Sequence, residues 1–198
     1  RQRWRLNILS NRVEAPNNGL SEDYMARLFG TDGVRGIANA DLSCELALQI
    51  GAAGAYVLTS AVHNPRILVG MATRRSGVML AAALTAGICS VGGDVLNVGV
   101  IPTPAMAYLA RLYEADAAVM ISASHNTMEY NGIKWFDGDG FKLSDALEDE
   151  IERLIRERTE LPHPTGVGVG HAIEARRAVD EYKAFLCGTA QTRFDGLR

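Results

Sequence analysis

One stretch of the chain indicates the fold most clearly: Ala117-Ala118-Val119-Met120-Ile121-Ser122-Ala123-Ser124-His125-Asn126. Residues 117–121 form an unbroken apolar run, which predicts a strand buried on both faces. The polar residues that follow place a hydroxyl, an imidazole and an amide at the end of that strand. Open α/β sheets bind their ligands at this edge, where a hydroxyl can act as a nucleophile or carry a transferable group. A polar turn is the simpler explanation for this cluster alone, so the other segments must decide.

On both sides of this strand, predicted helices and strands alternate along the chain. The helices are 44–60 after the cap Ser43, 77–91 after Ser76, 104–113 after Thr103, and one that follows Ser144; the other strands are 66–70, 94–98 and a short one within 27–37. This order predicts an α/β fold, a three-layer α/β/α sandwich with a mostly parallel sheet. Two short strands, 133–136 and 141–143, are expected to pair around the turn at 137–140 and to make the sheet mixed.

The two ends of the chain differ from this pattern. Residues 1–24 are polar and rich in turn residues, and we expect a disordered or non-native leader there. Residues 25–160 are expected to form the main domain. Residues 161–198 are predicted to continue a Pro- and Gly-rich linker into a helix at 174–187, which packs through Val179, Tyr182 and Leu186.

The composition excludes several classes of function. The chain has 198 residues, 22% of them charged, with a net charge of −3 and with Lys and Arg dispersed, so we expect neither a nucleic-acid nor a membrane partner. No apolar signal-peptide core is visible near the start. The longest apolar stretch, 78–91, is interrupted by small and polar residues and predicts a buried helix. Three widely spaced cysteines without metal-ligand spacing favour reduced thiols and a cytoplasmic protein.

Two glycine-rich segments could bind an anion. Residues 30–36 place Arg35 among three glycines, and both exposed backbone N–H groups and a guanidinium suit phosphate. Residues 70–77 run from a strand end into a helix start, which also favours an anion. In isolation, a surface turn with a solvated arginine is slightly favoured for the first segment, and an ordinary βα loop is favoured for the second. The Asp-rich turn at 137–140 lacks the third ligand and late Glu of a calcium loop, so we expect a tight turn there.

Taken together, these segments resemble the α-D-phosphohexomutase family. The resemblance covers about residues 25–190 and is carried, in the family's order and spacing, by residues 29–36, 73–77, 102–105, 121–126, 131–136 and 139–143. It implies that Ser124 is the phosphoserine, which phosphorylates a sugar phosphate, forms a bisphosphorylated intermediate and takes back the other phosphate. It also implies further roles: His125 and Lys134 in proton transfer, Arg35 as an active-site cation, and Asn126, Arg74 and Thr31 in substrate or phosphate binding.

The resemblance further implies a Mg²⁺ cofactor, bound in part through the phosphate on Ser124. The family's second-domain metal loop, Asp-Gly-Asp-Gly-Asp-Arg, does not occur in the chain, so these residues would be the N-terminal part of a larger enzyme. We expect them to need the missing C-terminal domains as partners and to be inactive, or nearly so, alone. Two positions depart from the family pattern: Ala72 replaces a usual Asp, and Thr127 a common Pro.

The sequence leaves the substrate open. The motifs are closest to the branch that interconverts the 6- and 1-phosphates of a hexosamine, glucosamine. Enzymes of the same family that act on phosphomannose or phosphoglucose are the alternative. A non-catalytic domain that binds a phosphosugar or a partner protein is a third reading, and an unpaired domain face would then favour a homo-oligomer.

Overall fold

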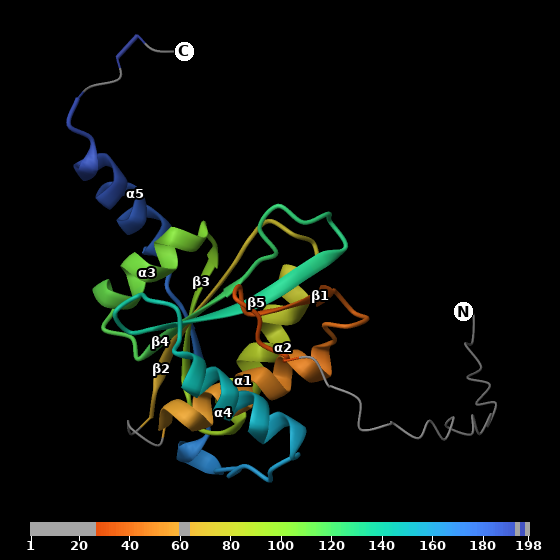
Figure 1. The fold of residues 1–198 in the computed structure, drawn as a ribbon. Coiled ribbons are helices and arrows are strands. Elements are labelled where there is room, and N and C mark those ends of the chain that lie inside the picture. The colour runs from red at the N-terminus through yellow and green to blue at the C-terminus, as the bar shows by residue number, and fades with distance from the viewer. Residues whose placement is uncertain (1–26, 60–63, 193–194, 197–198) are drawn as a thin grey trace, which may run out of the picture.

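A six-stranded sheet lies between two layers of helices in the computed structural model of this protein (Figure 1). The structure describes residues 27–59, 64–192 and 195–196, so the predicted leader lies outside the described residues. The strands are β1 (Val34–Ile37), β2 (Arg66–Met71), β3 (Asp94–Val100), β4 (Ala117–Ile121), β5 (Tyr130–Asp137) and β6 (Ala172–Glu174). The helices are α1 (Cys44–Thr59), α2 (Gly77–Ser90), α3 (Thr103–Leu112), α4 (Asp145–Arg156) and α5 (Ala178–Thr189), with a 3-10 turn at Gly166–Gly168.

The sheet order is β1-β5-β4-β2-β3-β6. Strands β4, β2, β3 and β6 run parallel, whereas β5 is antiparallel to both of its neighbours, β1 and β4. The predicted mixed, mostly parallel sheet is therefore confirmed, and the antiparallel strand that makes it mixed contains the predicted strand 133–136. Residues 133–136 belong to the long strand β5, and residues 141–143 form only an isolated bridge, Phe136 to Lys142. The Asp137 carboxylate accepts the Phe141 N–H at 2.9 Å, so the chain turns tightly there and leads into α4.

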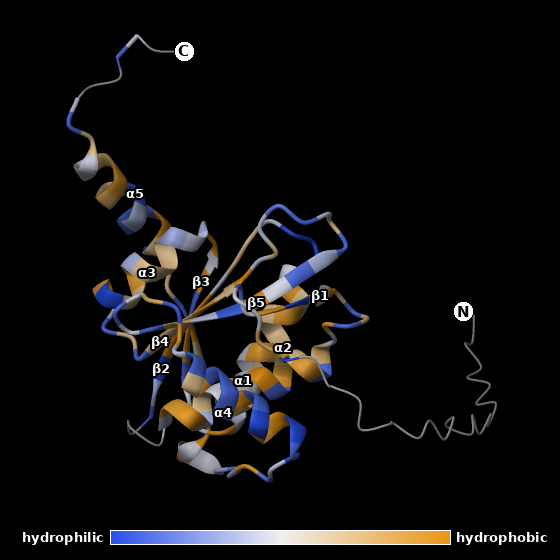
Figure 2. Cartoon of the chain, in the orientation of Figure 1, coloured by the Kyte–Doolittle hydropathy of each residue, from blue (hydrophilic) through white to orange (hydrophobic). Residues whose placement is uncertain are grey.

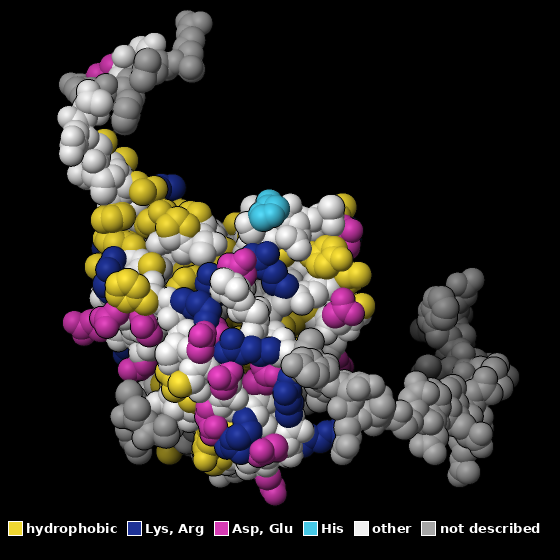
Figure 3. Space-filling model, viewed as in Figure 1, with side chains coloured by type: hydrophobic (Ala, Val, Ile, Leu, Met, Phe, Trp, Pro, Cys, Tyr) yellow, Lys and Arg dark blue, Asp and Glu magenta, His cyan; other side chains and the backbone are white. Residues whose placement is uncertain are grey.

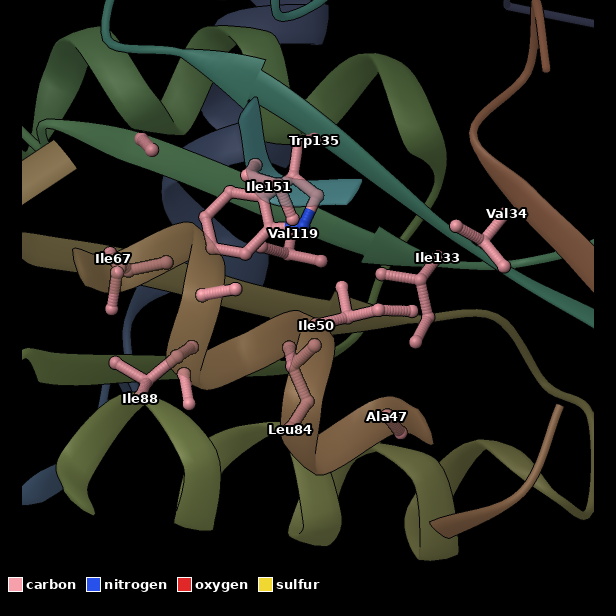
Figure 4. Close-up of a cluster of buried hydrophobic side chains, with 14 of the residues drawn as sticks. Val34, Ala47, Ile50, Ile67, Leu84, Ile88, Val119, Ile133, Trp135 and Ile151 are labelled. Carbon is pink, nitrogen blue, oxygen red and sulfur yellow. The ribbon is translucent and has the colours of Figure 1, made fainter. Parts of the chain in front are cut away.

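Each face of the sheet is covered by its own set of helices. Helices α1, α2 and α4 pack on one face around the fully buried Trp135 and Ile50 (Figure 4). Helices α3 and α5 pack on the other face around Leu68 and Met106. The three-layer sandwich predicted from the sequence is thus confirmed. Among the residues described, no helix is both long enough and apolar enough to cross a membrane.

Two of the four predicted helix caps are confirmed. The hydroxyls of Ser43 and Ser144 each accept a backbone N–H from three residues further on, at 3.2 and 3.4 Å. The prediction for Ser76 was wrong: its backbone is helical, and its hydroxyl accepts a hydrogen bond from the Asn131 amide at 2.9 Å instead. The prediction for Thr103 was also wrong, since α3 begins at that residue and the preceding proline is the cap.

Helices α1 and α2 lie unusually close because glycines face the contact. A Cβ added at Gly51 would lie 2.3 Å from the Leu84 carbonyl oxygen, and one added at Gly87 would lie 2.1 Å from the Leu48 carbonyl oxygen. Neither neighbour is a flexible side chain that could move aside. The two helices therefore pack backbone against backbone, and only glycine fits at these two positions.

The C-terminal segment contains a strand that the sequence did not reveal. The predicted linker before the helix contains β6, which extends the sheet beside β3. Helix α5 begins at Ala178 instead of residue 174, and Ala178 and Tyr182 are its buried residues. The predicted contacts of Val179 and Leu186 were wrong, because these side chains are 39% and 46% exposed. Instead, the ring of Phe185 stacks on that of Tyr108, with 4.0 Å between the ring centroids. Hydrophobic side chains gather where α5 meets α3 (Figure 3).

Candidate functional site

Ser124 lies in the loop that leaves the carboxyl end of β4, the central strand between β2 and β5. Its backbone has φ +54°, a left-handed conformation that residues other than glycine adopt uncommonly. Its N–H donates to the Ser122 hydroxyl at 3.2 Å, and its own Oγ lies 3.2 Å from Nδ1 of His125. The hydroxyl is therefore held at the sheet edge where α/β proteins bind ligands. The surrounding loops are hydrophilic, in contrast to the helices α1 and α2 (Figure 2).

A pocket of about 250 Å³ opens beside Ser124. Three strands, one helix and the adjoining loops supply its walls, which consist of Asp32, Arg35, Thr103, Met120, Ser122, Ser124 and Lys134. The register of the sheet explains this convergence. Lys134 on β5 pairs with Met120 on β4, and Arg35 on β1 pairs with Gly132, two residues before Lys134. Side chains two residues apart on a strand point to the same face of the sheet. Arg35 and Lys134 therefore both lie on the face that contains the pocket.

The pocket carries two cations around one carboxylate. Asp32 contacts Nη2 of Arg35 at 3.2 Å with one oxygen and Nζ of Lys134 at 3.5 Å with the other. The Nε of Arg35 is buried and has no hydrogen-bond partner among the described residues. The site therefore has an excess of positive charge and an unused donor, and both favour an anionic ligand.

We expect Asp32→Asn to strengthen the binding of inorganic phosphate about threefold to tenfold. The carboxylate competes with an incoming anion for Arg35 and Lys134, and tenfold in affinity corresponds to only about 1.4 kcal/mol. The measurement is a phosphate titration of the ¹⁵N-labelled chain by NMR at low salt, where surface charges are least screened. Asp180→Asn on α5 is the matched control, because Asp180 pairs with Lys183 away from the pocket. Equal or weaker binding by Asp32→Asn would show that Asp32 does not compete with the anion.

Three residues predicted to bind phosphate or substrate do not line this pocket. Both terminal nitrogens of Arg74 donate to backbone carbonyls of the Ser124 loop, and Arg74 is not among the residues that line the pocket of Arg35 and Lys134. Thr31 lines an adjoining shallow hollow together with Arg27 and Gly30. Asn126 lines a further hollow together with Arg74 and Ser124 itself. One pocket thus brings together Ser124, Arg35 and Lys134, whereas Arg74 and Asn126 line a second hollow with Ser124, and Thr31 lines a third with Arg35.

Sequence reasoning missed four residues that line the pocket: Asp32, Thr103, Met120 and Ser122. Asp32 could have been identified, since it stands three residues before Arg35 in the same glycine-rich segment. Thr103 follows β3 and opens α3, so it also belongs to the carboxyl edge of the parallel strands. Met120 could not have been identified from the sequence, because an apolar residue inside a buried strand gives no sign of a site.

The described residues do not form a magnesium site by themselves. No group of three His, Cys, Asp or Glu side chains among them could hold a metal ion. Asp32 is the one carboxylate in the wall of the Ser124 pocket, and it is already shared between two cations. Mg²⁺ requires several oxygen ligands in near-octahedral geometry, and this part of the chain does not provide them.

The serine loop and the two cations lie together at the carboxyl edge of this α/β sheet, an arrangement that suits a phosphorylated ligand. The sequence pattern described as phosphoglucomutase/phosphomannomutase, alpha/beta/alpha domain I, matches residues 26–162. The chain therefore belongs to the phosphoglucomutase/phosphomannomutase family, of which it contains domain I.

The similar curated proteins agree on one activity. Phosphoglucosamine mutase of Thermoanaerobacter sp. (strain X514) is 58% identical over 88% of this chain and 39% of its own length. The protein of the same name from Thermoanaerobacter pseudethanolicus is 61% identical over 83% of the chain and 37% of its own length. The chain thus spans about two fifths of the length of the curated relatives it matches.

Solved structures show the same fold. A phosphoglucomutase/phosphomannomutase family protein from Burkholderia thailandensis superposes with a TM-score of 0.64 at 25% identity, covering 79% of this chain and 34% of that one. A protein described as a phosphomannomutase from Thermus thermophilus gives a TM-score of 0.64 at 27% identity, covering 79% of this chain and 35% of that one.

Proposed function

We propose that this chain is the phosphoserine-bearing domain of a phosphoglucosamine mutase, which interconverts glucosamine 6-phosphate and glucosamine 1-phosphate for cell-wall precursor synthesis. The identities of 57–61% to proteins of that name support this assignment. The observation that carries it is the position of the Ser124 hydroxyl, at the end of β4 and in one pocket with Arg35 and Lys134.

The geometry suits phosphoryl transfer between Ser124 and a sugar hydroxyl. In the forward step the oxygen of a sugar hydroxyl bonds to phosphorus while the bond from phosphorus to Ser124 Oγ breaks. The proton that the sugar hydroxyl releases ends on Oγ, which becomes a hydroxyl. Arg35 and Lys134 neutralise the charge that spreads over the transferring oxygens. His125, 3.2 Å from Oγ, is placed to hand the proton on. The reverse step, with the sugar turned round, returns the other phosphoryl group to Ser124.

The remaining parts of the activity are assigned to the rest of the protein. The relatives are more than twice as long as the region they share with this chain, and we propose that their additional domains are its partners. Mg²⁺ remains the proposed cofactor of the whole protein, with most of its ligands outside these residues. We therefore expect the 198 residues alone to accept a phosphoryl group but not to interconvert the two monophosphates.

The decisive experiment is the intact mass of the purified chain before and after incubation with glucosamine 1,6-bisphosphate. We expect a gain of about 80 Da, the mass of one phosphoryl group, which peptide mapping assigns to Ser124. The gain should disappear in Ser124→Ala and persist in Thr127→Ala, which removes a neighbouring hydroxyl of the same loop. A gain that survives in Ser124→Ala would overturn the assignment of the nucleophile. No gain in the wild-type chain would mean that this domain does not form a competent acceptor alone.

A second substrate class is favoured by one observation, the names of the solved structures, which concern phosphomannose and phosphoglucose enzymes. The same assay with mannose and glucose 1,6-bisphosphates distinguishes the classes. Faster phosphorylation by either of these than by the glucosamine compound would favour the second class. Saturable binding of all three without any gain in mass would favour a non-catalytic phosphosugar-binding domain.

A further inference from the structure

One arginine of another loop forms hydrogen bonds with the loop that carries Ser124. Arg74, between β2 and α2, donates through Nη1 to the carbonyls of Thr127 at 2.6 Å and Tyr130 at 2.9 Å. Through Nη2 it donates to the carbonyls of Ser124 at 3.0 Å and Asn126 at 2.8 Å. One guanidinium thus binds four carbonyls of one loop. Figure 1 shows the two loops extending side by side above β5.

These bonds act on a backbone that would not adopt its shape without support. Ser124 lies in the left-handed region at φ +54°, and such conformations persist only where surrounding contacts impose them. Within the loop, the Asn126 N–H donates to the Ala123 carbonyl at 3.1 Å. At the far end of the loop the fully buried Asn131 donates to Ser76, which ties the same two segments together a second time. The Arg74 contacts include the carbonyl of Ser124 itself, so they bear directly on that residue.

We propose that Arg74 is a positioning residue, which fixes the Ser124 loop so that the hydroxyl faces the pocket of Arg35 and Lys134. The role in transfer rests on the proposed function, whereas the role in loop geometry does not. The planar guanidinium presents its donors in a rigid fork that matches the four carbonyls. A lysine has the same charge but only one nitrogen, so it cannot span the same set. This role differs from the substrate- or phosphate-binding role that the resemblance implies for Arg74.

The first test compares Arg74→Lys with Arg75→Lys, which makes the same exchange at the exposed neighbouring arginine. In ¹⁵N-labelled chains we expect Arg74→Lys to shift the amide resonances of residues 124–130 and to lower their heteronuclear NOE values. Resonances of β2 and β4 should stay in place, because Arg74 is a member of neither hydrophobic cluster. Arg75→Lys should leave the loop unchanged. Unshifted resonances of 124–130 in Arg74→Lys would overturn the proposal. Arg74→Gln, which keeps amide donors but removes the charge, provides a second variant if Arg74→Lys does not fold.

The second readout is the rate at which glucosamine 1,6-bisphosphate phosphorylates Ser124. We expect Arg74→Lys to be at least about 10-fold slower at saturating bisphosphate, since small misplacements of a reacting group lower rates steeply. The concentration for half-maximal rate should change little, because Arg74 does not line the pocket. If the wild-type chain is not phosphorylated, this domain does not form a competent acceptor alone, and the NMR comparison still decides the positioning role. If Arg74→Lys reacts at the wild-type rate, the positioning proposal fails alone.

Discussion

Gly87→Ala is expected to lower the free energy of unfolding by about 3 kcal/mol, although the same change in an open helix is stabilising. The new methyl group would lie 2.1 Å from the Leu48 carbonyl oxygen and 2.9 Å from the Ala52 nitrogen. Both neighbours are backbone atoms of α1, so the two helices would have to separate. Overpacking a close contact in this way typically costs about 1–3 kcal/mol, and sometimes more. Urea unfolding followed by circular dichroism measures the change directly.

Gly188→Ala is the matched control for this prediction. Gly188 lies in α5, and a Cβ built there has no heavy atom within 4 Å. The exchange of glycine for alanine should therefore contribute only its helix propensity and stabilise the chain by up to about 1 kcal/mol. The opposite signs of the two variants would identify the close approach of α1 and α2 as the cause. Equal stability of Gly87→Ala and the wild type would mean that the helices are not as close as the structure shows.

Lys134→Met is expected to slow phosphorylation of Ser124 by at least about 100-fold. Methionine keeps most of the length and the apolar stem of the side chain but removes the charge that faces the pocket. Removing one preorganised group that stabilises developing charge commonly costs about 10²–10³ in rate. The loss would also leave Asp32 paired with Arg35 alone, so that the carboxylate weakens the remaining cation. The measurement is the initial rate of mass gain with glucosamine 1,6-bisphosphate.

Lys183→Met on α5 supplies the control for charge in general, because this lysine is 66% exposed and pairs with Asp180 on the same helix. We expect it to react at the wild-type rate. Circular dichroism should show the same fold for both variants. A rate for Lys134→Met within about threefold of the wild type would be incompatible with a role in neutralising the transferring phosphoryl group, which requires electrostatic stabilisation.

Local patterns were sufficient to predict the elements that depend on local chemistry. The apolar run at 117–121 became β4, and the hydroxyl caps at Ser43 and Ser144 marked two helix starts correctly. Strand β6 was missed because its three residues are all exposed and carry no pattern of their own. Its position is decided by the free edge of β3, which is far away in the sequence.

The site could be predicted only in part, because some of its contacts join residues that are far apart in the sequence. The resemblance singled out Ser124, Arg35 and Lys134, and the pocket contains all three. The ion pairs of Asp32 depend on the pairing of β1 with β5, which no local pattern specifies. The predicted pairing around 137–140 is present only as an antiparallel bridge between Phe136 and Lys142, and β5 forms its longer pairings with β1 and β4. The contacts of Arg74 could not be predicted either. An arginine suits phosphate, but both terminal nitrogens of Arg74 donate to carbonyls of a loop about 50 residues further along the chain.

The strand order also sets the sequence of events during synthesis on the ribosome. Val34 pairs with Ile133, so the first strand waits for roughly 100 further residues before its partner is made. Contacts over such separations form late, after the more local parallel pairs of β2, β3 and β4. Arg35 therefore joins the serine loop only after β5 has been made. A nascent chain that has not yet released β5 contains the serine but cannot yet have the cationic side of its pocket.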